Sequence, residues 1–174
     1  IPLIAAGGIA TGRGMLAAMV LGADGVQMGS RFAASVESSA HDNFKSTVVA
    51  SKEGDTQLTL KELAPVRLIK NKFYQQVQEL YAKGATKEEL IQLLGRARAK
   101  RGMFEGDLEE GELEIGQISG LIHDIQPVSK IIESILTEFQ LAQKESVKTE
   151  VTVERADTSD YSLEDRYNYI IITL

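Results

Sequence analysis

The sequence contains no cysteine, and this absence excludes several kinds of site. Without a thiol there can be no disulfide bond, no thiolate zinc site and no cysteine nucleophile. The absence fits a cytoplasmic protein. No stretch approaches the roughly eighteen apolar residues of a membrane span, and the first residues lack the basic leader and cleavage pattern of a signal peptide. We therefore expect neither a membrane segment nor a secretion signal.

Positive charge is also scarce. The 174 residues include 19 Lys and Arg against 25 Asp and Glu, which gives a formal net charge of −6. A negative net charge argues against a general nucleic-acid binder. Hydrophobic residues make up 43% of the chain and charged residues 25%, both near average. The composition therefore predicts a soluble globular protein.

Residues 1–32 predict a βαβ unit. Residues 2–6 form a short apolar run without polar alternation, which is typical of a strand buried on both faces of a parallel sheet. Residues 15–21 are good to fair helix formers, and Gly22 suits the end of that helix. Residues 26–28 predict a second strand. A strand, a helix and a strand over so few residues favour a right-handed crossover between parallel neighbours.

Glycines follow both predicted strands. A glycine at a strand end lets an anion approach main-chain N–H groups. The next helix, which we expect to begin at Ser30 as N-cap and to continue through Val36, favours negative charge at its start. One such turn alone is usually only a turn, but two neighbouring turns form the usual phosphate site of a (β/α)8 barrel. We therefore predict a phosphate site made chiefly by main-chain N–H groups, with one side chain nearby: Gly7, Gly8, Gly29 and Ser30, with Met28 beside them.

Several segments resemble a known family. Residues 5–9 and 22–32 look like the C-terminal end of an FMN-dependent barrel, a pattern that also occurs in inosine-monophosphate dehydrogenases and glutamate synthases. Residues 37–41, 65–71 and 116–121 read ESSAH, PVRLIKN and GQISGL. They resemble the nitronate monooxygenase family, formerly called 2-nitropropane dioxygenase, which includes the flavin-dependent enoyl-ACP reductases. The resemblance extends to about Phe139 and implies an α/β fold, a (β/α)8 TIM barrel that binds FMN.

The resemblance implies an FMN-dependent oxidoreductase that oxidises alkyl nitronates with O2. An alternative within the family is an enoyl-ACP reductase that takes electrons from NAD(P)H and acts on an acyl chain carried by acyl carrier protein. A barrel needs roughly 250 residues, yet only two barrel strands can be recognised. We therefore expect the chain to be the C-terminal part of a longer protein, with the family's catalytic histidine upstream. A third possibility, of another class, is an inactive barrel fragment that only associates through exposed sheet edges.

Residues 116–121 contain two candidates for the flavin pocket, Gln117 and Ser119. Two glycines around a polar pair suit a backbone packed close to a ligand, although a tight turn before the last helix would give the same pattern. In the resembling family this segment returns to the flavin. Arg67 could reach an anionic substrate, but we favour a structural salt bridge for it.

The two histidines are weak candidates for a catalytic base. His41 directly precedes a predicted helix over residues 42–52, where a capping or surface role is favoured. His123 follows a turn, and we expect it at the surface. Residues 105–114 are rich in carboxylates, but their irregular spacing predicts a mobile acidic loop and no metal site.

Residues 56–60 alternate in polarity and predict an edge strand with Leu58 and Leu60 on one side. Residues 67–71 should lead into a helix whose apolar positions recur at helical spacing as far as Gly84.

Thr86 and Glu89 have the spacing of a capping box. The helix that they begin should run to Arg101 and end in basic residues that complement its dipole. These basic residues could instead dock an acidic partner such as acyl carrier protein, but the acidic loop can neutralise them within the chain.

Residues 127–140 predict a long amphipathic helix that closes the domain, with Pro127 in its first turn. We divide the chain into residues 1–36, the C-terminal βα units with the phosphate site, residues 37–143, a mainly helical region, and residues 144–174. This last part is an atypical tail without an assigned role, in which β-prone residues near both ends permit a hairpin.

Overall fold

The computed structural model describes residues 1–148, 152–155 and 170–173. The predicted βαβ unit is present: β1 (Ile4–Ala6) and β2 (Gly25–Gln27) pair in parallel, with α1 (Gly12–Val20) between them. The helix begins earlier than the sequence analysis indicated. The hydroxyl of Thr11 accepts a hydrogen bond from the N–H of Gly14 at 3.0 Å and caps it.

The helix expected from Ser30 to Val36 is wrong in its start and its length. α2 (Ser30–Ala33) has Gly29 as its N-cap, and Val36 is exposed. The hydroxyl of Ser30 does not cap the helix because it accepts the N–H of Gly116 at 3.1 Å. The chain then turns away, since the N–H of Val36 donates to the carbonyl of Gln126 at 3.1 Å.

α3 (Asp42–Ala50) confirms the helix predicted after His41. The imidazole Nδ1 of His41 accepts the N–H of Asn43 at 3.1 Å, so this histidine caps the helix as expected. Phe44 and Val48 are buried in one apolar cluster with Ile69.

A hairpin follows that the sequence analysis found only in part. β3 (Thr56–Thr59) confirms the first strand, although Leu58 points outward and is 38% exposed. Residues 67–71 lead into a helix as predicted, since Asn71 caps α4, but the sequence analysis missed the strand β4 (Val66–Ile69), which pairs antiparallel with β3. The other edge of β4 binds residues 113–115, where the N–H of Ile69 donates to the carbonyl of Leu113 at 3.0 Å. This partner lies so far along the chain that local sequence gives no sign of it.

α4 (Lys72–Ala82) and α5 (Lys87–Leu94) cover this hairpin, and Thr86 and Glu89 form the predicted capping box. The helix expected to reach Arg101 is wrong. α5 ends at Gly95, whose φ of +64° lies in the left-handed region that glycine tolerates best. A separate π-helix follows at Lys100–Phe104.

Three of the four basic residues after α5 pair with carboxylates of the acidic loop, as predicted. Lys100 pairs with Glu105 at 2.9 Å, and Arg101 pairs with Asp107. Arg98 donates to the carbonyls of Leu93, Leu94 and Glu110, and its guanidinium carbon lies 4.5 Å from the centre of the Phe73 ring. Arg98 therefore holds the end of α5, the acidic loop and α4 together.

The chain returns through a 3-10 helix (Gln117–Leu121) to α6 (Val128–Lys148), which confirms the closing helix and is longer than expected. α6 packs on α1. Gly12 lies at this contact, where a Cβ would overlap main-chain atoms of Ile135 and Phe139. The N–H of Gly12 also donates to the carboxylate of Glu138 at 2.9 Å.

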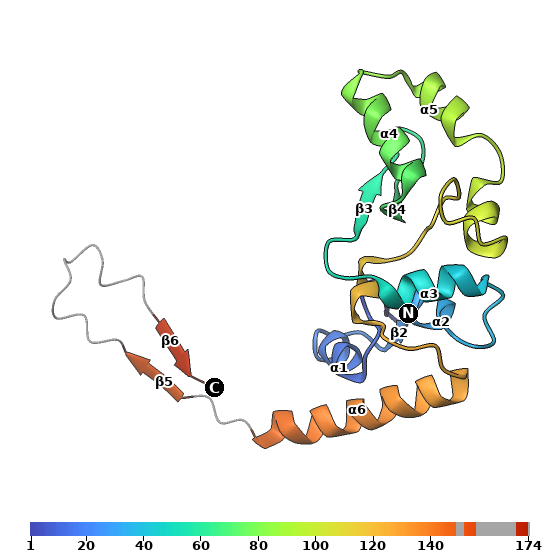
Figure 1. The fold of residues 1–174 in the computed structure, drawn as a ribbon. Coiled ribbons are helices and arrows are strands. Elements are labelled where there is room, and N and C mark those ends of the chain that lie inside the picture. The colour runs from blue at the N-terminus through green and yellow to red at the C-terminus, as the bar shows by residue number, and fades with distance from the viewer. Residues whose placement is uncertain (149–151, 156–169, 174) are drawn as a thin grey trace, which may run out of the picture.

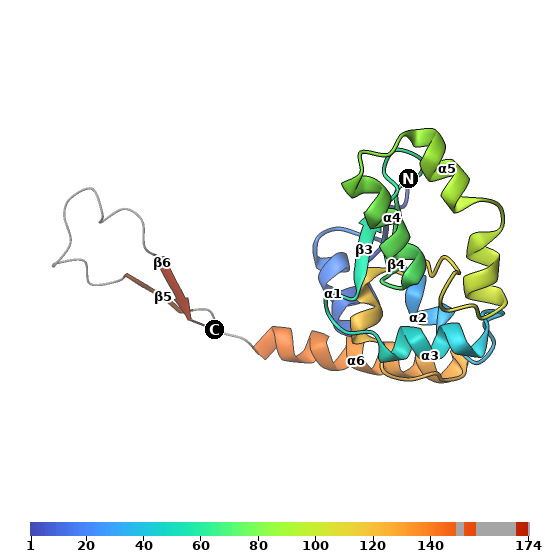
Figure 2. The same cartoon turned by 45° about the horizontal axis from the view of Figure 1, so that its top comes forward.

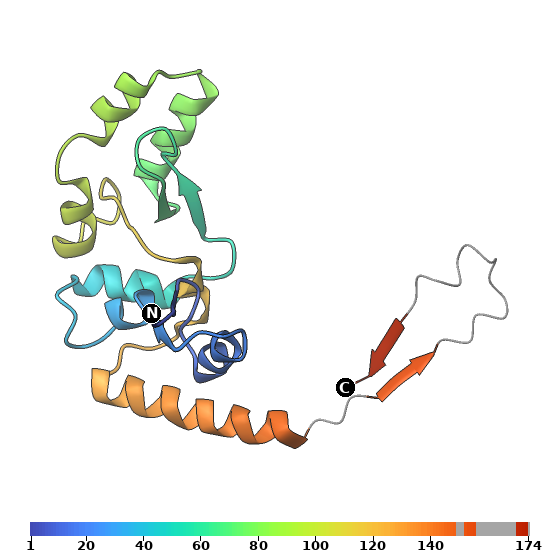
Figure 3. The same cartoon turned by 180° about the vertical axis from the view of Figure 1, so that it is seen from behind.

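Residues 1–148 form an elongated body (Figures 1 and 3). α6 lies at one end, the β3–β4 hairpin with α4 and α5 lies at the other, and α3 lies between them. Figure 2 shows the same arrangement after the view is tilted, with β5 and β6 lying apart from the rest of the chain beyond the end of α6. One apolar cluster lies around Phe44 and Ile69, and a second one joins Leu60, Leu68 and Phe73 of the hairpin region. Neighbouring residues of β4 thus belong to different clusters.

Near the C-terminus, β5 (Thr152–Arg155) and β6 (Ile170–Thr173) pair antiparallel. Residues 144–148, which the sequence-based division placed in the tail, belong to α6, and residues 149–151, 156–169 and 174 lie outside the described residues. No helix in the described part of the chain is long and apolar enough to cross a membrane.

Candidate functional site

The carboxyl ends of β1 and β2 present main-chain donors that the protein itself does not use. The N–H groups of Gly7, Gly8, Gly29 and Ser30 have no acceptor among the described residues. Gly7 and Gly8 have φ values of +88° and +69°, a conformation that a side chain would strain. A Cβ at Gly7, Gly8 or Gly29 would meet no atom within 4 Å. Open space therefore lies beside these glycines, which carry unused donors.

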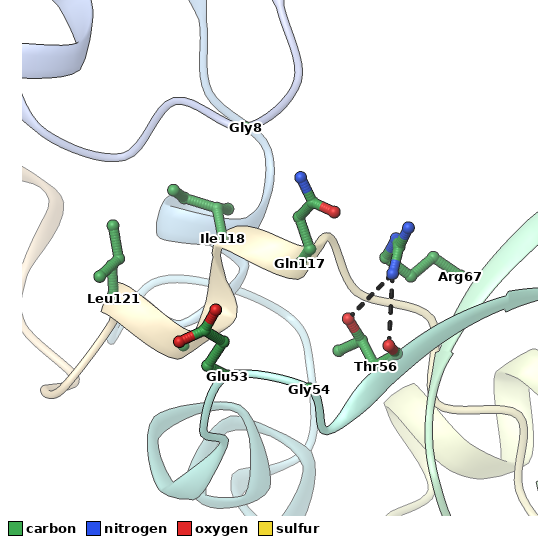
Figure 4. Close-up of a pocket in the computed structure, with 9 residues that line it drawn as sticks. Gly8, Glu53, Gly54, Thr56, Arg67, Gln117, Ile118 and Leu121 are labelled. Carbon is green, nitrogen blue, oxygen red and sulfur yellow. Dashed lines mark hydrogen bonds between the residues drawn. The ribbon is translucent and has the colours of Figure 1, made fainter.

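One hollow of about 580 Å³ lies beside the first glycine turn. Figure 4 shows Gly8 facing the segment that carries Gln117 and Ile118, with Arg67 next to Gln117 and Glu53 on the opposite side. The structure thus brings together two residues that the sequence analysis named separately, Gly8 and Gln117.

A second hollow of about 510 Å³ lies beside the other glycine turn. Gly29 and Ser30 line it together with Arg67, Glu114 and Gly116. The hydrogen bond from the N–H of Gly116 to Ser30 ties the returning segment to this turn, and a Cβ at Gly116 would lie 2.7 Å from the Ser30 hydroxyl oxygen. Glycine at 116 therefore permits the close approach that brings Gln117 beside the strand ends.

Arg67 lines both hollows, which the sequence analysis did not anticipate. One of its terminal nitrogens, Nη1, donates to the carbonyl and to the hydroxyl of Thr56, each at 3.3 Å (Figure 4). The salt bridge favoured for it is wrong, since no carboxylate of the described residues lies within ion-pair distance of its guanidinium. The only signal in the sequence was its place in the PVRLIKN segment.

The remaining predicted residues lie apart from these hollows. Ser119 is fully buried, and its hydroxyl has no hydrogen-bond partner. Gly7 and Met28 do not belong to the set of residues that lines either hollow. His123 is exposed, as expected.

Two carboxylates near the second hollow are held in a low-polarity environment. Burial raises the pKa of Glu114, which lines that hollow. Burial, and next the negative charge of Glu114, raise the pKa of Glu112 to about 7, against a smaller opposing effect of Arg98. A pKa of about 7 reduces the negative charge that Glu112 carries near neutral pH.

A model of the nitronate monooxygenase family matches residues 1–138. The chain belongs to this family. A probable nitronate monooxygenase from Staphylococcus saprophyticus is 36% identical over 139 residues, which are 79% of this chain and 39% of that protein. The chain therefore spans about two fifths of the length of this curated relative. Family membership and the resemblance described from the sequence agree.

Among solved structures of similar fold, FabK from Thermotoga maritima is 44% identical, with a TM-score of 0.75 over 84% of this chain and 47% of that one. The nitroalkane oxidase from Streptomyces ansochromogenes is 29% identical, with a TM-score of 0.64 over 84% of this chain and 41% of that one. The nitronate monooxygenase family is a family of oxidoreductases, and it and these structural neighbours are flavoproteins. The observed chain is of mixed α/β class.

Proposed function

We propose that the chain is part of an FMN-dependent nitronate monooxygenase that oxidises alkyl nitronates with O2. In this proposal β1 and β2 are neighbouring strands of a (β/α)8 barrel, and the two glycine turns hold the flavin phosphate. The supporting observation is the group of unused N–H donors at the carboxyl ends of two parallel strands. Such donors, next to a helix N-terminus, suit an anion.

The residues present fit a flavin phosphate. There is open space at the Cβ positions of Gly7, Gly8 and Gly29, and Gly8 lines the same hollow as Gln117, which would lie against the flavin. Met28 adjoins the second turn in sequence, and we assign it a place beside the phosphate site. The flavin supplies the redox chemistry, while these residues bind the phosphate and help to exclude water. The described residues offer no group of three potential metal ligands, and the proposed chemistry requires none.

The phosphate site can be tested with Gly29→Val in the full-length protein. A side chain at this position meets no neighbour within 4 Å and the φ of −94° suits valine, so the variant should fold. The new side chain would cover the donors and weaken FMN binding. Retention of FMN with parental affinity would contradict the proposed site. Riboflavin, which lacks the phosphate, should bind both proteins more nearly alike.

The 44% identity to FabK favours a second candidate, an enoyl-ACP reductase that uses NAD(P)H and an acyl chain on acyl carrier protein. The two activities differ in the electron donor. Without oxygen, an alkyl nitronate should bleach the flavin absorbance of a monooxygenase in the absence of any nicotinamide. Bleaching by NADH or NADPH alone, followed by recovery with an enoyl thioester, would instead establish the reductase.

A further inference from the structure

Arg67 lines a hollow beside each of the two glycine turns. It lines the hollow of Gly8 and Gln117 as well as the hollow of Gly29 and Ser30, and among the residues that line these two hollows it alone is common to both. It comes from β4, whose main chain is fixed on both edges, by β3 on one side and by Ile115 on the other. The guanidinium is therefore delivered to this position by a rigid element.

Most of the hydrogen-bonding capacity of Arg67 is unused. A guanidinium has five N–H donors in a fixed planar arrangement. The bonds to the carbonyl and hydroxyl of Thr56 both come from Nη1, and no acceptor for Nε or Nη2 is found among the described residues. A partly buried guanidinium without a carboxylate partner is unusual for a residue whose role is only structural.

The surrounding charges leave room for an anion at this position. Glu53 also lines the first hollow and makes no ion pair with Arg67. Glu114 lines the second hollow, where burial raises its pKa, and it makes no ion pair with Arg67. Gly8, Gly29 and Ser30, whose N–H groups are unused, line the same two hollows, and such main-chain donors also attract an anion.

We propose that Arg67 is the positively charged partner of the flavin phosphate, an assignment that rests on the FMN site proposed above. The main-chain donors of the glycine turns hold the phosphate from the barrel side, and Arg67 binds it from the β3–β4 hairpin. Arg67 is then a binding residue that couples the hairpin region to the cofactor. Gln117, which lies next to Arg67 in Figure 4, adds a neutral polar contact.

The test compares Arg67→Met with the parent in the full-length protein, through the dissociation constants of FMN and riboflavin measured by flavin fluorescence. Riboflavin lacks the phosphate and reports every other contact of the flavin. Lys70→Met is the matched control, because it removes one exposed positive charge just beyond the end of the same strand, outside both hollows. Arg67→Lys keeps the charge without the planar arrangement of donors.

We expect Arg67→Met to weaken FMN binding by about tenfold to a hundredfold, as the loss of hydrogen bonds to a charged group predicts, and to leave riboflavin binding unchanged. Arg67→Lys should fall between Arg67→Met and the parent, and Lys70→Met should match the parent. If Arg67→Met weakened the binding of FMN and riboflavin equally, or left FMN affinity unchanged, the role of Arg67 would be overturned while the phosphate site could stand. A parent that binds FMN no more tightly than riboflavin would instead overturn the phosphate site and this inference with it.

Discussion

Glu112 gives a pH-dependent test of how the excursion between the second glycine turn and α6 is packed. Its side chain is only 7% exposed, and it lies two residues from another partly buried carboxylate, Glu114. Burial and the charge of Glu114 raise the pKa of Glu112 from 4.5 to about 7. Burial therefore disfavours the ionised form, and the native state holds the proton more tightly than the unfolded chain does.

The sign and size of the effect follow from this difference. Well below pH 4.5 Glu112 is protonated in both the native and the unfolded state, so its ionisation does not change the free energy of unfolding. As the pH rises towards 7 the unfolded chain releases its proton first, so the native state progressively loses stability relative to it. Each pH unit between the two pKa values corresponds to about 1.36 kcal/mol, so the loss is complete above the folded pKa and amounts to at most about 3 kcal/mol.

Glu112→Gln removes the titrating group and keeps the shape of the side chain. We expect the variant to gain up to about 3 kcal/mol over the parent between about pH 4 and about pH 8.5, with the gain accumulating as the pH approaches neutrality. The assay is urea unfolding followed by far-ultraviolet circular dichroism, because the chain has no tryptophan for fluorescence. The difference between variant and parent cancels the titration of all other groups.

Glu109→Gln is the matched control, since Glu109 is an exposed carboxylate in the same acidic loop. Its free energy of unfolding should match that of the parent at both about pH 4 and about pH 8.5. A Glu112→Gln gain that is the same at low and high pH, or absent at high pH, would refute the reasoning, because the benefit would then not come from a carboxylate that burial keeps protonated.

Three further changes test packing and capping by the same unfolding assay. Gly12→Ala should destabilise the protein by about 1–3 kcal/mol, because its Cβ would overlap the main chain of α6, whereas Arg13→Ala, at an exposed neighbour, should cost less than about 1 kcal/mol. Arg98→Met should cost about 3–5 kcal/mol, since three main-chain carbonyls and Glu110 lose their donor; a cost below that of Arg13→Ala would contradict this role. Thr86→Ala should cost about 1 kcal/mol through loss of the capping box, and an unchanged unfolding midpoint would argue against the cap.

The elements found correctly from the sequence are those whose causes are local. The hydroxyl of Thr86 and the carboxylate of Glu89 satisfy N–H groups within one helical turn, so their spacing alone predicts the start of α5. The imidazole of His41 likewise acts two residues away. β1 and β2 also follow from short-range information, because an apolar run and its glycine recur within one βαβ unit.

The elements that were missed depend on partners far along the chain. β4 is a strand because β3 and residues 113–115 supply acceptors and donors on its two edges. Ser30 looked like an N-cap, yet its hydroxyl binds Gly116, 86 residues away. Local patterns contain no information on such partners, so in both cases a tertiary contact overrode the local preference.

The same distinction limits what the sequence says about the proposed site. The glycines were predictable, because they directly follow the two predicted strands, where a phosphate site requires accessible main-chain N–H groups. Arg67 was assigned a salt bridge because a lone arginine usually has a carboxylate partner, and only the pairing of β4 places it beside both turns without one. The N–H of Gly116 donates to the hydroxyl of Ser30, so this contact fixes the side chain beside the returning segment and leaves the main-chain N–H groups of Gly29 and Ser30 and the guanidinium of Arg67 for an anion. Long-range contacts thus decide which of the predicted polar groups remain free to bind a ligand.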